Sequence, residues 1–314
     1  MKVICSKGDG REAFLPVKEG EWLTRMNGAA VFRFSTPQAE WVMEPGDRVQ
    51  CRNGEETLFD GFVFQTERGI REQEAVCYDR VKYLLYRDTR IFQNRTAGEI
   101  TAEILAERML KMESAETGYV LPLLIMEERP LLEMIRRAIS ETKAASGREY
   151  FLADRQGILS LREAGAEAAG VLLSGGNQIL SFRERRDIDG DTFNRFQIRQ
   201  EDRRRGFRRI TVLDDTESQR KWGVLQYAER IDSRLNPAQA AARLQALHRK
   251  KCRERKGLEI EAWSESSCCA GRSVMVRLRK GETAERYLIC EAEHRFSGGS
   301  GRMRLVLRKM EEER

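Results

Sequence analysis

The chain has 314 residues, of which 40% are hydrophobic and 34% charged, and its net charge is +6. This length fits two or three domains, and a folded chain of this size buries enough apolar surface to need neither disulfides nor a metal for its core. No window approaches 18 uncharged apolar residues, which excludes a membrane-spanning helix, and the charged first 20 residues do not predict a secretory signal.

Residues 1–88 are predicted to form a small β-barrel. Short β-type runs within this region are separated by turn signals such as Asn27-Gly28 and Asn53-Gly54. Asn-Gly favours a tight hairpin turn because both residues tolerate positive φ. Several short strands in about 80 residues are typical of a barrel or sandwich.

Residues 89–170 are predicted to form an α/β unit with two helices. Thr96 and Glu99 have the spacing of a capping box, and apolar residues from Ile100 to Met109 recur at helical spacing, which predicts a helix over residues 97–112. Pro130 is favourable in the first turn of a second helix, and Gly147 ends that helix. A β-hairpin completes the unit.

Residues 171–314 are predicted to form a second β-barrel with a helical insertion at about 215–256. Asn236 and Pro237 are start signals for the inserted helix, which runs to about Glu254. The strand-like runs on either side of this helix have the alternation that a barrel wall uses.

An internal similarity links the two β regions. Gly46-x-x-Val49 and Gly271-x-x-Val274 each precede a turn and two further β-type runs. We therefore expect Val49 and Val274 at matching positions. The predicted fold class is α+β and β-rich, with two tandem small β-barrels flanking an α/β unit.

The sequence assigns no catalytic, cofactor-binding or metal-ligating residue, and we expect no cofactor. His248 and His294 lie near no nucleophile motif, and no glycine-rich phosphate loop is present. Cys252, Cys268, Cys290 and His294 would form a metal site only by chance convergence. The seven cysteines, an odd number without a framework pattern, are expected to be reduced and mostly buried.

The strongest candidate for a binding surface is a basic helix. The bases in and just after its predicted range are Arg243, Arg249, Lys250, Lys251, Arg253, Arg255 and Lys256. Like charges at this density favour docking against an acidic partner, which is a neighbouring subunit or another protein. A solvated helix face is the alternative. The stretch lacks aromatic residues for base stacking, so we do not expect specific nucleic-acid binding.

Several short motifs in order resemble the XkdQ/YqbQ-like tail proteins of prophages and phage-tail-like particles. They are Pro45-Gly46-Asp47-Arg48-Val49, Leu58-Phe59-Asp60-Gly61-Phe62-Val63, Cys77-Tyr78-Asp79-Arg80, Phe92-Gln93-Asn94-Arg95-Thr96-Ala97, Thr117-Gly118-Tyr119-Val120-Leu121-Pro122, Tyr227-Ala228-Glu229-Arg230-Ile231-Asp232 and Tyr287-Leu288-Ile289-Cys290. The resemblance extends from about residue 20 to residue 310, and its specificity comes from the ordered set.

The resemblance implies a structural protein without enzymatic activity, the baseplate hub of a contractile phage tail or tail-like injection particle. Such a hub is a homotrimer whose ring adapts the sixfold tail tube to the threefold spike. Its implied partners are the tail tube, spike, tape-measure and neighbouring baseplate proteins, and its implied location is a particle assembled in the bacterial cytoplasm, without membrane insertion. A tail-associated peptidoglycan hydrolase is the alternative. The kind of particle and the target cell stay open.

Overall fold

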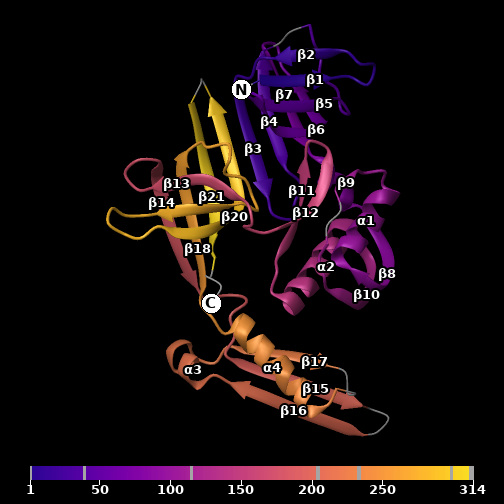
Figure 1. Ribbon diagram of the computed structural model, residues 1–314, viewed down its shortest axis with the longest axis vertical. Coiled ribbons are helices and arrows are strands. Elements are labelled where there is room, and N and C mark those ends of the chain that lie inside the picture. Colours follow the sequence, from indigo (N-terminus) through magenta and orange to yellow (C-terminus); the bar gives the residue numbers. More distant parts are fainter. Residues whose placement is uncertain are drawn as a thin grey trace. The chain divides into compact units, whose positions relative to one another are not determined.

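The computed structural model describes residues 2–37, 40–113, 116–202, 206–231, 235–297 and 300–310 (Figure 1). The chain divides into two compact units. The main unit comprises Met1–Arg183 and Leu258–Arg314, and the inserted unit comprises Glu184–Gly257. Among the described residues, no helix is both long and apolar enough to cross a lipid bilayer.

A large sheet dominates the main unit and confirms the β-rich class. Its N-terminal strands are β1 (Lys2–Ser6), β2 (Glu12–Leu15), β3 (Glu19–Arg25), β4 (Val31–Pro37), β5 (Arg48–Asn53), β6 (Glu56–Arg68) and β7 (Glu72–Tyr78). Its C-terminal strands are β13 (Ala168–Ser174), β14 (Ile179–Asp187), β18 (Arg255–Trp263), β19 (Ser273–Arg277), β20 (Glu285–Ser297) and β21 (Ser300–Lys309). The main strand order is β14-β18-β21-β20-β3-β4-β7-β6-β5-β1-β2, and β13 and β19 extend it beside β20.

The long strand β20 joins the two β regions into one sheet. Its first residues pair with β19, where Ser273 lies opposite Leu288, and its later residues pair with β3, where Glu291 lies opposite Arg25. The expected pair of separate closed barrels is therefore not what forms, because β14 and β2 lie at opposite ends of an open strand order. Each β region nevertheless keeps its own hydrophobic core.

The two β regions share one local topology. Strands β5, β6 and β7 are antiparallel neighbours in sequence order, and so are β19, β20 and β21. Val49 and Val274 are each the buried second residue of the first strand in their series. The two valines therefore occupy the same position in their strand series, and their superposition stays a prediction.

A helical region lies between the two β regions of the main unit. It contains η1 (Arg80–Leu85), β8 (Arg87–Thr96), α1 (Ala97–Glu107), β9 (Met112–Glu113), β10 (Val120–Pro130), α2 (Leu131–Ser146), β11 (Tyr150–Arg155) and β12 (Ile158–Glu163). The capping box of Thr96 and Glu99 is present, and Gly147 ends α2 with a φ of 77°. Strands β8 and β10 form a two-stranded sheet that the sequence did not predict.

The inserted unit is a three-stranded sheet covered by a helix. Its elements are β15 (Arg195–Asp202), β16 (Phe207–Asp214), α3 (Thr216–Trp222), β17 (Gln226–Ile231) and α4 (Pro237–Lys251). The strand order is β16-β15-β17, and α4 lies across one face of this sheet (Figure 1). This unit begins near residue 184, about thirty residues before the expected insertion. Strands β15 and β16 belong to it because Phe196 and Ile198 pack against Leu244 and Leu247 of α4.

Candidate assembly surfaces

Helix α4 carries fewer of the predicted docking bases than expected. The helix begins after the capping residue Asn236 and ends at Lys251, so Arg253, Arg255 and Lys256 lie outside it. Arg255 and Lys256 are the first residues of β18. The predicted end of this helix, at about Glu254, was wrong. The apolar residues that α4 buries end at Leu247, so no packing supports the helix beyond its last turn.

Two of the bases on α4 make contacts inside the inserted unit. The Nε atom of Arg243 donates a hydrogen bond of 2.8 Å to the Glu229 carboxylate, which lowers the pKa of Glu229. Lys251 pairs with Asp191, and its ammonium lies 5.0 Å from the centroid of the Tyr227 ring. These contacts fasten α4 to its sheet and leave Arg243 and Lys251 poorly placed for a partner.

Arg249 and Lys250 are two further exposed bases on α4. They occupy the last turn of the helix, where positive charge is favourable beside the carbonyl end of the helix dipole. Positive side chains that are held only by this weak effect remain available to an acidic partner.

The inserted unit also has an exposed sheet face opposite α4. Ile210 and Val212 of β16 lie on this face and are 46% and 40% exposed. Arg199 of β15 stands between Ile210 on one side and Arg230 of β17 on the other. An apolar centre bordered by arginines is typical of protein interfaces. The sequence analysis missed this surface. Consecutive residues of a strand point to opposite faces of its sheet, so the consecutive apolar residues of β16 could have indicated that both faces of this strand contact other residues.

A groove lined by five glutamates and four basic residues crosses the sheet in the described part of the main unit. It has a volume of about 830 Å³ and lies over β3, β4, β7 and β20. Arg33 neutralises Glu21 at 2.6 Å, whereas Glu19, Glu67 and Glu74 are exposed carboxylates along the same groove. Glu67 and Glu74 lie directly opposite each other on β6 and β7, where like charges destabilise the pairing. A basic partner would relieve this repulsion.

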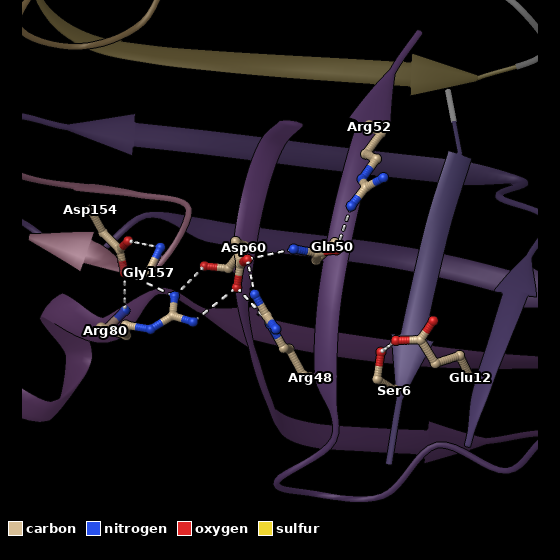
Figure 2. Close-up of polar contacts among 9 residues, drawn as sticks. All are labelled: Ser6, Glu12, Arg48, Gln50, Arg52, Asp60, Arg80, Asp154 and Gly157. Atoms are coloured by element: carbon tan, nitrogen blue, oxygen red, sulfur yellow. Dashed lines mark hydrogen bonds and ion pairs between the residues drawn. The ribbon is translucent and has the colours of Figure 1, made fainter. Parts of the chain in front are cut away.

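A buried ion network holds the helical region of the main unit against its N-terminal strands. The guanidinium of Arg80 lies between the carboxylates of Asp60 and Asp154, at 3.0 and 3.3 Å, as Figure 2 shows. Arg48 and Gln50 each donate a further hydrogen bond of 2.6 Å to Asp60. Burial alone raises the pKa of Asp60, but these donors hold it below its ordinary value.

The same network lines a cavity of about 260 Å³, and the residues around this cavity include the carboxyl groups of Asp60, Asp79 and Asp154. Burial and the Asp154 charge raise the pKa of Asp79 well above its usual range, a property shared with catalytic acids. Both oxygens of Asp79, however, accept hydrogen bonds from backbone N–H groups, and Asp60 and Asp154 bind Arg80. These contacts of the three carboxyl groups support the fold.

Neither histidine occupies an open catalytic cleft. His294 is fully buried and hydrogen-bonded to Ser264 and to the Cys268 carbonyl, and burial lowers its pKa to about 4. His248 lies on α4 and bonds Asp215 through Nε2 at 2.7 Å. Cys252, Cys268, Cys290 and His294, which only chance would bring together, form no group of metal ligands among the described residues. His248 and Cys252 instead lie near Asp215, within the inserted unit.

Known proteins that are similar to this chain include proteins of prophages and phage-like elements. A curated relative, the phage-like element PBSX protein XkdQ of Bacillus subtilis, is 26% identical over 265 residues, which cover 83% of this chain and 81% of the relative. The 43 kDa tail protein of prophage MuSo2 from Shewanella oneidensis matches with a TM-score of 0.71 at 15% identity, covering 98% of each chain.

A secretion-system protein has a similar fold. It is an E. coli component of the type VI secretion system, described as structurally similar to the bacteriophage T4 tail proteins gp27 and gp5. It matches with a TM-score of 0.59 at 11% identity, covering 95% of this chain and 74% of the other. A family model described as YQBQ-like matches residues 21–308. The chain therefore belongs to the YQBQ-like family, as its ordered motifs predicted.

Proposed function

We propose that this protein is a structural component of a phage tail or tail-like particle and forms the hub of its baseplate. The observation that carries this proposal is the fold match to a prophage tail protein, which covers 98% of both chains. A match of that extent includes the inserted unit as well as the sheet, so the likeness concerns the complete architecture. The protein would then be located in the assembled tail or tail-like particle.

The hub role requires a homotrimer that presents six similar elements to a sixfold tube. Each chain supplies two β regions whose three-strand series have the same order, β5-β6-β7 and β19-β20-β21. Three chains thus provide six such series. This repeat supports a ring that adapts a sixfold tube to a threefold spike, with tube, spike, tape-measure and other baseplate proteins as neighbours.

Complementary charges supply a means of assembly. Glu19, Glu67 and Glu74 are exposed carboxylates on the main unit, and Arg249 and Lys250 are exposed bases on the inserted unit. Opposite charges on different copies, or on this chain and a tail protein, steer association and select the partner.

The mass of the purified chain tests the trimer. Light scattering coupled to size-exclusion chromatography should give about three times the 36.3 kDa of one chain. A monomer at every concentration, in the absence of tail proteins, would contradict the trimeric ring.

The tail role is tested separately by deleting the gene in the source bacterium and inducing the prophage. Electron microscopy should then show no complete tails until the gene is restored, and intact tails would refute the role.

A further inference from the structure

We propose that Asp215, His248 and Cys252 form a binding site for a divalent transition metal of the zinc class. Their ligand atoms, a carboxylate oxygen, a ring nitrogen and a thiol sulfur, all lie within 4.8 Å of one another. This site belongs to the inserted unit alone and is independent of the proposed tail function.

Two elements of the inserted unit bring these donors together. Asp215 is the N-cap of α3, and its side chain accepts the backbone N–H of Ser218. His248 lies in the last turn of α4, and Cys252 is the capping residue that follows this helix. A spacing of four residues places two side chains on one face of a helix, as in known helical metal motifs.

The distances fit a coordination sphere after a small adjustment. Zinc binds nitrogen and oxygen at about 2.0–2.2 Å and sulfur at about 2.3 Å, so tetrahedral ligand atoms lie roughly 3.3–3.6 Å apart. The present limit of 4.8 Å requires side-chain movements of about 1 Å. Asp215 and His248, now 2.7 Å apart, would separate slightly as the metal replaces their hydrogen bond.

The donor set selects the metal. A thiolate, an imidazole and a carboxylate together suit zinc or cobalt, whereas magnesium and calcium prefer oxygen ligands alone. Binding releases the Cys252 thiol proton to solvent, because the thiolate is the ligand. The three side chains are only partly buried, so a metal has access and water can occupy the fourth position.

A bound metal would stabilise the inserted unit as a cross-link between its helices. The unit spans Glu184–Gly257, and its cluster of buried apolar residues has four described members, Phe196, Ile198, Leu244 and Leu247, with five partly buried neighbours. Small domains with cores of this size commonly rely on metals or other cross-links. A metal here would tie the start of α3 to the end of α4.

Cobalt titration of the full-length chain tests the site. The protein should be purified without a polyhistidine tag, reduced, and stripped of metal with a chelator. One equivalent of Co²⁺ should produce a thiolate-to-cobalt charge-transfer band and the intense visible bands of a tetrahedral complex, and Zn²⁺ should abolish both. Absence of these bands at equimolar Co²⁺ would overturn the proposal.

Variants assign the ligands. Cys252→Ser should lose the charge-transfer band, whereas Cys290→Ser, a partly buried cysteine of the main unit, should retain it. Asp215→Asn keeps an efficient helix cap but removes the carboxylate, so its zinc affinity should fall at least tenfold while its circular dichroism stays native. Zinc should also raise the Tm of the wild type more than that of Asp215→Asn. A band that survives in Cys252→Ser, or equal affinity in Asp215→Asn, would refute the assignment.

Discussion

Trp22 of β3 stacks on His294 of β20, with ring centroids 5.1 Å apart and an angle of 26° between the rings. The two residues are also register partners, although 272 positions separate them in the sequence. This contact lies where the N-terminal and C-terminal β regions become one sheet. His294 is thus a neutral, aromatic component of the junction.

Stability should fall on acidification because His294 is buried without charge. Its folded pKa of about 4 lies below the ordinary value of 6.5, so only the unfolded chain binds this proton between those values. The free energy of unfolding that depends on neutral His294 is fully present above pH 6.5. About 3 kcal/mol of it is lost as the pH falls from 6.5 to about 4. Urea unfolding between pH 7 and pH 4 measures this loss.

The matched variant is His294→Gln, which preserves hydrogen-bonding capacity and does not titrate. The difference in unfolding free energy between variant and wild type should change by about 3 kcal/mol across this pH range. Carboxylates that titrate in the same range cancel in the comparison. Parallel stability curves for the two proteins would show that His294 is not responsible.

Asp60→Ala should destabilise the main unit strongly. The change leaves the Arg80 guanidinium buried with one carboxylate in place of two, and it removes the acceptor of Arg48 and Gln50. Breaking a buried pair in this way costs about 3–5 kcal/mol. Asp9→Ala, which removes the exposed partner of Arg11, is the control and should leave the denaturation midpoint unchanged. Equal midpoints for the two variants would contradict the role of the network.

Gly61→Ala tests the close packing of β6 against the end of β7. A Cβ atom at Gly61 would lie 2.2 Å from the carbonyl oxygen of Tyr78, so the backbone must shift. We expect a loss of about 1–3 kcal/mol in thermal or chemical unfolding. Gly8→Ala introduces a methyl group into open space and should have little effect. A tolerated Gly61→Ala would mean that the two strands separate easily.

Reversing Arg249 and Lys250 to glutamate should impair assembly while the subunit stays folded. Both side chains face solvent, so their loss removes charge complementarity without disturbing the packing of α4. Particle yield after complementation of a deletion strain is the measurement, and circular dichroism checks the fold. Lys111→Glu combined with Arg136→Glu gives the same change in net charge at exposed positions of the main unit. Equal yields from both double variants would identify the bases of α4 as a solvated face.

The structural role of Lys251 gives a contrasting expectation. Lys251→Ala removes an ion pair with Asp191 and the contact with the Tyr227 ring, so the inserted unit should lose about 1–2 kcal/mol of stability. Hydrogen exchange of α4 amides reports this loss locally. Unchanged protection in the variant would show that the helix is held by its apolar stripe alone.

Features with a local physical cause could be read from the sequence. The capping box of Thr96 and Glu99 satisfies backbone donors within one turn, and Gly147 supplies the left-handed conformation that ends α2. Ala240, Leu244 and Leu247 have the spacing typical of one helix face, and they are the residues that α4 buries. Ordered short motifs were sufficient to indicate the family.

Tertiary structure alone decided how these elements combine. Alternation along a strand shows which faces are buried but not which strand lies beside it, so the pairing of β20 with β3 had no local signal. For the same reason the sequence predicted β15 and β16 in a barrel wall, whereas Phe196 and Ile198 of β15 and Leu213 of β16 pack on α4. The tertiary structure also determines which bases form ion pairs within the unit. Lys251 pairs with Asp191 only after the inserted unit has folded, whereas Lys250 is exposed to solvent.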